Sequence, residues 1–494
     1  MGRLLVATWG DPFAWREARY RLTGSNNEVK SVTSLSILIE ELSPDKVIVL
    51  VPETLLSPSP RSGDEIKRLG GRLLIEDIGS LKGEHSEWYR NLLNHLKRAI
   101  SSFCREKGLE AEVVLMPNLG EYNGVEWRIE AGVNPDSAYA AFTLLSTLSA
   151  VSDLAGCDIN ISLDVTHGVN FMSLAAYRAV KTACMVLSAT LHTNVTFEHY
   201  NSTPYPSGTS GTPELEVFKV GEEVVTPVKA AQRLIYSYAS ADRVNPIRRS
   251  RDSGGAKVIS DELEKLREVH EDVRPLAAAI HYSMPLAFLQ FSSELMSSGK
   301  ANLLDSLPFI SWPPSQGLSL IYLLSEVRVG GEQGRSIAPR RSRLQEPEEA
   351  SLSLFHRFLW NKALEDLGVR GGPVEAPLSL LRETLKYLRG PLVKVAEHEL
   401  SHLEELRDED LRKAFETSKG NWVKVKDGCE NQRRILVAHA GLAKRSLELK
   451  KEVDREMDGD TIILRYYGPC LDSLRDLLSS ELRESIGELI RGKF

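Results

Sequence analysis

Side chains suited to metal-free RNA cleavage gather near residue 434. Arg434 stands five residues before His439, Arg433 is adjacent, and Asn431 lies just upstream. In that reaction a ribose 2′-hydroxyl attacks its own phosphate. A histidine can move the protons near neutral pH, and a fixed guanidinium can stabilise the growing charge. The residue types fit this chemistry, but the spacing alone is not distinctive, because similar pairs occur at Arg90–His95 and Arg274–His281.

Helix geometry limits how Arg434 and His439 can cooperate. Five residues at about 100° each separate the two side chains by roughly 140° around an ideal helix. They are therefore not stacked neighbours, as residues four apart would be. We expect the pair to work where a helix starts, or where two copies of the chain pool their motifs.

The flanks of this pair carry a resemblance. The stretch RRILVAHAGL resembles the R-N-x-x-A-H-x-G signature of the HEPN domain, an all-helical ribonuclease fold with a composite dimer site. The resemblance implies that Arg434 and His439 are catalytic. Ile435 departs from the signature, which has a polar residue there. Asn431 is the candidate replacement for that polar group, and Arg433 is a candidate to share the phosphate role.

A second group of polar residues follows three expected strands. Because ligands bind beyond the carboxyl ends of parallel strands, these loops define a candidate binding site. A helix N-terminus after the third loop would offer free N–H groups to a phosphate, and Gly168 would allow close backbone approach. Helix capping by Asp164 or Thr166 explains the third loop equally well. The candidate binding residues are Gly10, Asp11, Glu53, Thr54, Thr166, His167, Gly168 and Asn170.

Two strings in these loops suggest a family. LDVTHGVNFM resembles the D-x-T-H-G-x-N signature of the CARF domains of CRISPR-associated accessory ribonucleases, and ATWGDPFAW resembles their turn after the first strand. The resemblance covers about the first 220 residues. It implies a two-fold dimer that senses cyclic oligoadenylate, with cyclic tetraadenylate or cyclic hexaadenylate as the activator. Neither GxGxxG nor GxxxxGK[ST] occurs at the expected place, which disfavours a nicotinamide dinucleotide and a P-loop nucleotide.

The elements that would position these residues fall into three parts. Apolar runs at 4–9, 46–51, 111–116 and 159–165 alternate with helical patterns at 31–42, 87–106, 137–153 and 169–187, and a hairpin follows at 194–220. This alternation predicts an α/β Rossmann-like N-terminal domain at 1–225. Beyond it we predict an all-helical connector at 226–345, with a linker at 329–349, and an all-helical HEPN domain at 346–494. One short strand-like stretch, TIILRYY at 461–467, interrupts the last domain.

Composition narrows the class of protein. The chain has 494 residues, 42% of them hydrophobic and 26% charged, which is typical of a globular protein. A net charge of −7 disfavours a protein that binds nucleic acid over most of its surface. Five scattered cysteines argue against a disulfide framework and suggest a reducing compartment. With no long apolar stretch, we expect a cytoplasmic protein with no membrane association.

Together the motifs predict a type III CRISPR antiviral ribonuclease. It would be a homodimer or higher oligomer that cleaves single-stranded RNA without a metal or cofactor, and its products would end in a 2′,3′-cyclic phosphate. One alternative is a non-catalytic CARF regulator that binds nucleic acid, and another is a CARF protein that degrades its own cyclic oligoadenylate. A third alternative is a zinc peptidase, suggested by His398 and His402 in the string HELSH.

Overall fold

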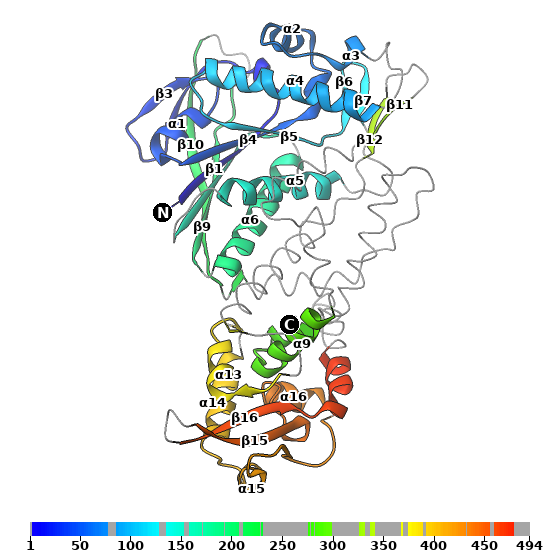
Figure 1. Ribbon diagram of the computed structural model, residues 1–494. Helices are drawn as coiled ribbons and strands as arrows, with labels where there is room; N and C mark the ends of the chain where they lie inside the picture. Colours follow the sequence, from blue (N-terminus) through cyan, green and yellow to red (C-terminus); the bar gives the residue numbers. More distant parts are fainter. Residues whose placement is uncertain are drawn as a thin grey trace. The chain divides into compact units, whose positions relative to one another are not determined.

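The computed structural model contains two compact units. The N-terminal unit comprises Met1–Thr226 and Pro308–Ser351, and the C-terminal unit comprises Pro227–Leu307 and Leu352–Phe494 (Figure 1). The structure describes residues 2–77, 85–127, 135–152, 158–169, 171–191, 193–206, 211–227, 229–230, 275–276, 278–280, 282–298, 326–330, 336–340, 367–368, 374–388, 392–430, 432–454 and 459–478.

An eight-stranded sheet organises the N-terminal unit, with strand order β3-β2-β10-β9-β8-β1-β4-β5. The five strands from β9 to β5 are parallel, whereas β10 runs antiparallel to β9. The strands are β1 (Gly2–Trp9), β2 (Ala18–Leu22), β3 (Glu28–Ser31), β4 (Lys46–Pro52), β5 (Glu112–Met116), β8 (Ile159–His167), β9 (Val195–Ser202) and β10 (Glu214–Val225).

Helices cover both faces of this sheet. The central strands carry apolar side chains on both faces, so each face must be buried. Leu5, Ala7 and Trp9 of β1 share one core with Leu92 and Leu96 of the long helix α4. Helices α5 and α6 pack against the other face (Figure 1). The helices are α1 (Leu35–Leu42), α2 (Pro60–Arg68), α3 (Leu74–Asp77), α4 (His85–Glu106), α5 (Pro135–Ser152) and α6 (Phe171–Leu191), with short 3-10 turns η1 (Pro12–Ala14) and η2 (Glu53–Leu56).

The predicted Rossmann-like α/β domain is confirmed in its parallel strands, its helices and its antiparallel hairpin. The hairpin was expected at the edge of the sheet, and this position is wrong, because β2 pairs with β10 and β3 lies beyond it. Strands β2 and β3 were not predicted. They are short, and their exposed residues alternate with partly or fully buried ones, so no continuous apolar run marks them. The helix expected at 31–42 begins only at Leu35, because residues 28–31 pair with β2.

The prediction of an all-helical connector is wrong at 326–330 and 336–340, because both stretches are strands. Strands β11 (Glu326–Gly330) and β12 (Ser336–Arg340) form a four-stranded sheet with β6 (Gly120–Tyr122) and β7 (Val125–Trp127), in the order β11-β12-β7-β6. β12 runs parallel to β7, some two hundred residues earlier in the chain. A local pattern rich in Gly and Arg could not indicate so distant a partner. The helices expected at 259–270 and 351–366 lie outside the described residues.

The all-helical prediction for the C-terminal domain is also wrong, although the strand-like stretch expected at 461–467 is confirmed as a strand over 461–466. Four antiparallel strands form a sheet in the order β13-β16-β15-β14. Leu447 and Leu449 alternate with charged residues along β15, and the charges obscured the strand pattern. The elements are α9 (Pro285–Ser297), β13 (Ala376–Pro377), α13 (Leu378–Thr384), α14 (Val393–Glu404), α15 (Glu409–Ser418), β14 (Val423–Lys424), α16 (Arg433–Ala438), η5 (Lys444–Ser446), β15 (Leu447–Asp454), β16 (Gly459–Tyr466) and η6 (Gly468–Cys470).

Two further findings concern cysteines and membranes. Cys429, just before α16, forms a disulfide with Cys470 in η6, so the expectation from scattered cysteines missed this pair. The two cysteines are 41 positions apart in the sequence, and the segment between them includes the β15–β16 hairpin, which brings its two ends together. Among the described residues, no helix combines the length and apolarity needed to cross a membrane.

Candidate functional site

The loops after β1 and β8 meet at the carboxyl edge of the N-terminal sheet. β1 lies between β4 and β8, so the strand order reverses beside it, and this is where open α/β sheets bind ligands. The Gly10 N–H donates to the His167 carbonyl at 2.8 Å. The structure therefore brings two of the three predicted loops into direct contact.

Two contacts anchor the ring of His167. Its ring stacks on Trp15 with a centroid separation of 4.1 Å, and its Nε2 accepts a hydrogen bond from the Ser34 N–H at 3.2 Å. Burial lowers the pKa of His167 to about 4, although the negative charge of Asp164 opposes that change. The ring is therefore neutral at pH 7, with the proton on Nδ1. One of the two ring nitrogens predicted to contact a ligand is thus occupied within the fold.

The side chain of Asp164 holds the same loop by hydrogen bonds. Its carboxylate accepts hydrogen bonds from the Ser34 hydroxyl at 2.7 Å and from the Thr166 N–H at 2.9 Å. The turn after β8 is thereby tied to the start of α1, which belongs to a different part of the chain. From the sequence, Asp164 was expected only as a helix cap and Ser34 was overlooked, although Asp164 belongs to the same motif as His167.

Glycine is required in both loops because the backbone is crowded. A Cβ on Gly168 would lie 2.0 Å from the Ser173 hydroxyl and 2.3 Å from the Thr8 hydroxyl. A Cβ on Gly10 would lie 2.8 Å from a methyl group of Val169. The close approach expected at Gly168 is therefore made, in this structure, by the protein's own side chains.

The Thr166 hydroxyl differs from these groups in its hydrogen bonding. It is buried, yet it makes no hydrogen bond with any described residue. A buried polar atom without a partner costs about 1–3 kcal/mol, so a ligand that satisfied it would gain affinity. Asn170, the last residue of the predicted motif, lies outside the described residues.

The other predicted binding residues have partners inside the fold. Asp11 caps η1 by accepting from the Phe13 N–H, and it accepts from the Ser62 hydroxyl at 2.6 Å; burial raises its pKa. Glu53 is 1% exposed and accepts from the Tyr89 hydroxyl at 2.5 Å. Thr54 is equally buried and accepts from the Asn118 amide at 3.4 Å. These contacts give the three residues a structural role, because they tie the loops after β1 and β4 to α2, to α4 and to the segment after β5.

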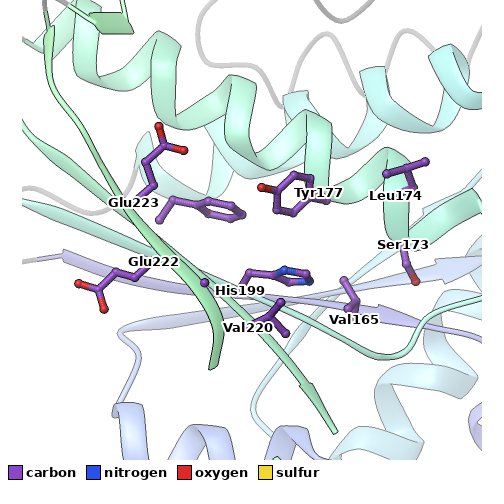
Figure 2. A pocket seen from close by; sticks show the side chains of 10 residues that line it. Val165, Ser173, Leu174, Tyr177, His199, Val220, Glu222 and Glu223 are labelled. Carbon is purple, nitrogen blue, oxygen red and sulfur yellow. The ribbon is translucent and has the colours of Figure 1, made fainter. Parts of the chain in front are cut away.

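A pocket of about 600 Å³ lies beside the third loop, between α6, β9 and β10. Figure 2 shows Tyr177 and His199 facing each other within it, with ring centroids 5.1 Å apart. Burial lowers the pKa of His199, so its ring is neutral at pH 7. Glu222 and Glu223 line the wall on β10. Lys219 and Lys181 pair with these two carboxylates, so the rest of the lining, which is largely aromatic and apolar, suits a planar apolar group better than a phosphate.

The second candidate site lies on α16. Arg434 is the second residue of this helix, is exposed, and makes no ion pair with the described residues. His439 directly follows the helix, and its side chain is 43% exposed. Arg433 begins α16, but its side chain lies outside the described part of the chain, as does all of Asn431. The expectation that the Arg begins a helix is confirmed, and His439 stands at the other end of the same short helix as its C-cap.

The turn after His439 is held from the adjacent sheet. Ala440 and Gly441 have positive φ angles of 46° and 76°, and the Gly441 N–H donates to the Leu436 carbonyl, which ends the helix. The buried Tyr466 hydroxyl of β16 donates to the Gly441 carbonyl at 2.9 Å. The backbone next to His439 is therefore fixed by β16.

A carboxylate from α14 contacts the candidate catalytic histidine. The Nδ1 of His439 lies 3.1 Å from Oε2 of Glu399. Glu399 belongs to the string HELSH, whose two histidines have ring centroids 4.1 Å apart. Within the described residues, no group of three or more His, Cys, Asp or Glu could hold a metal ion. The contact between Glu399 and His439 was not predicted, because nothing in the sequence links residue 399 to residue 439.

The sheet order and the paired loops define the N-terminal unit as a Rossmann-like α/β domain. More particularly, residues 4–204 match the family model described as the CARF domain of the CRISPR system endoribonuclease Csx1. A protein of Methanocaldococcus jannaschii named CRISPR system endoribonuclease Csx1 is 22% identical to this chain over 300 residues. That match covers 59% of this chain and 56% of the relative, so the chain spans about half the length of the curated relative it matches.

Proposed function

We propose that this protein is a ribonuclease of type III CRISPR defence that cyclic oligoadenylate activates. The observation that carries the proposal is the match of residues 4–204 to the CARF domain of Csx1, whose model is named for an endoribonuclease. The name of the M. jannaschii relative agrees. The effector, the RNA substrate and the dimer are our proposals for this chain.

The proposed effector site lies at the carboxyl edge of β1 and β8. The free Thr166 hydroxyl and the start of α6 supply polar groups for a phosphodiester ring. A cyclic and symmetric ligand suits a two-fold axis on which each copy of the chain presents the same loop. Cyclic tetraadenylate is our first choice of effector, and cyclic hexaadenylate is the second.

The proposed nuclease site uses Arg434 and His439 from two copies of the chain. His439 of one copy takes the proton of the ribose 2′-hydroxyl as the new O2′–P bond forms. Arg434 stabilises the charge on the phosphorus oxygens. The P–O5′ bond then breaks, and His439 of the other copy protonates the leaving oxygen. The products end in a 2′,3′-cyclic phosphate and a 5′-hydroxyl, and no step uses a metal.

Activation requires that the effector bind the cleaving state more tightly than the resting state. Allostery of this kind predicts that effector binding survives the loss of His439. We would measure both binding of cyclic tetraadenylate and RNA cleavage for the wild type and for His439→Ala. The proposal predicts unchanged binding with no cleavage in the variant. Equal cleavage by both proteins would overturn the assignment of His439.

The same experiment separates the alternatives. Effector binding by the wild type without RNA cleavage would favour a non-catalytic regulator, for which Ile435 in place of the usual polar residue is the specific observation. Loss of cyclic oligoadenylate over time in His439→Ala would favour a protein that degrades its own effector.

A further inference from the structure

Glu399 lies at the edge of the buried side of α14. Ala396, Leu400 and Leu403 form the apolar stripe by which this helix packs. Glu399 is three residues after Ala396 and four before Leu403, so it borders that stripe. Its side chain is only 18% exposed, whereas neighbouring Glu397 and His398 are exposed. Glu399 is thus the carboxylate on this helix that points toward the body of the unit.

The contact with His439 fixes which ring nitrogen carries the proton. A carboxylate can only accept hydrogen bonds, so the Nδ1 of His439 must be the donor to Glu399 at 3.1 Å. In the neutral ring Nε2 is then unprotonated and able to accept a proton. Free imidazole side chains are not held in this tautomer, so the carboxylate imposes it.

We propose that Glu399 is a positioning residue for His439. It holds the imidazole in the Nδ1–H tautomer and leaves Nε2 as the proton acceptor for the ribose 2′-hydroxyl. It also stabilises the ring when that proton arrives, because the carboxylate is negative and the protonated ring is positive. This inference rests on the proposed function, in which His439 is the general base.

The second anchor of His439 is the backbone turn, so the two supports are independent. Tyr466 holds the Gly441 carbonyl, two residues beyond His439, from β16. Glu399 holds the ring itself from α14. The tautomer therefore depends on Glu399, whereas the position of the backbone does not.

The test compares Glu399→Ala and Glu399→Gln with the matched control Glu397→Gln, which alters an exposed carboxylate on the same helix. Histidine ¹⁵N chemical shifts report the tautomer, and the His439 signals are identified by their absence in His439→Gln. We expect the Nδ1–H form in the wild type and in Glu397→Gln. We expect the Nε2–H form to dominate in Glu399→Ala. Glu399→Gln keeps an acceptor oxygen, so it keeps the tautomer but not the charge.

The kinetic readout is kcat against KM for RNA cleavage with effector bound. General acid–base catalysis contributes about 10²–10⁴-fold, so losing the orientation alone should lower kcat about 10- to 100-fold in Glu399→Ala. KM should not change, and Glu399→Gln should fall between Glu399→Ala and the wild type. An unchanged tautomer in Glu399→Ala, or a kcat equal to that of Glu397→Gln, would overturn the inference.

These outcomes are separable from failure of the proposed function. If the wild type cleaves no RNA, the proposed ribonuclease is wrong, and the tautomer measurement alone still decides whether Glu399 orients His439. Circular dichroism of each variant excludes loss of fold as the cause of a kinetic effect. Glu399→Gln serves as the second variant should Glu399→Ala fail to fold.

Discussion

The neutral His167 should make the N-terminal unit lose stability in mild acid. Its pKa is about 4 in the folded chain and 6.5 ordinarily, because burial disfavours the charged ring. Between those pH values the unfolded chain binds a proton that the folded chain does not. The free energy of unfolding therefore falls as the pH drops through 6.5, and the loss is complete below 4.

The size of this effect follows from the two pKa values. Linkage gives a loss of about 2.5 kcal/mol between pH 7.5 and 4.5 from this histidine alone. His167→Gln retains an acceptor for the Ser34 N–H but cannot titrate. The variant should therefore lose about 2.5 kcal/mol less than the wild type over the same interval.

Denaturant unfolding at pH 7.5, 6.5, 5.5 and 4.5 measures this difference. Trp15 stacks on His167, so tryptophan fluorescence reports on this part of the unit. Substitution of the exposed His398 by Gln is the control, and its curve should parallel that of the wild type. If the free energies of unfolding of the wild type and His167→Gln changed with pH in parallel, the reasoning would be refuted. The folded chain would then bind a proton at His167 as readily as the unfolded chain does.

Three further predictions concern single supports of the two sites. Gly168→Ala should cost about 1–3 kcal/mol in thermal unfolding and weaken cyclic tetraadenylate binding at least about 10-fold in calorimetry, because its Cβ would lie 2.0 Å from the Ser173 hydroxyl. Gly468→Ala, where the space is open, should change neither. Tyr466→Phe should cost about 1–2 kcal/mol, because it leaves the Gly441 carbonyl without its donor, and RNA cleavage should fall, whereas Tyr467→Phe serves as the control. Reduction of Cys429–Cys470, which closes 41 residues, should cost about 4 kcal/mol in chemical unfolding. Unfolding of Cys470→Ser should not respond to reductant, and a response would contradict the assigned pair.

The parallel sheet could be predicted because its strands are continuous apolar runs. β1, β4, β5 and β8 are buried on both faces, so their composition alone marks them. The strands that escaped prediction depend on partners far away in sequence. β12 pairs with β7, and β15 forms a hairpin with β16 in spite of its charged residues. No local pattern contains that information.

The candidate sites were predictable only as lists of residues. The third loop contains a recognisable motif. The sequence did not reveal that Ser34 would donate hydrogen bonds to both Asp164 and His167. Glu53 and Thr54 were predicted from their place after a strand, and the structure instead pairs them within the fold. The contact of Glu399 with His439 could not be predicted, because it depends on how α14 packs near the end of α16.

The central claim is that effector binding in the N-terminal unit permits metal-free RNA cleavage through Arg434 and His439. The most direct test is cleavage of single-stranded RNA in EDTA, with and without cyclic tetraadenylate, by the wild type and by the Arg434→Ala/His439→Ala variant. The account predicts cleavage only by the wild type and only with effector. Cleavage by the double variant at the wild-type rate, or no cleavage by the wild type with cyclic tetraadenylate or cyclic hexaadenylate, would contradict it.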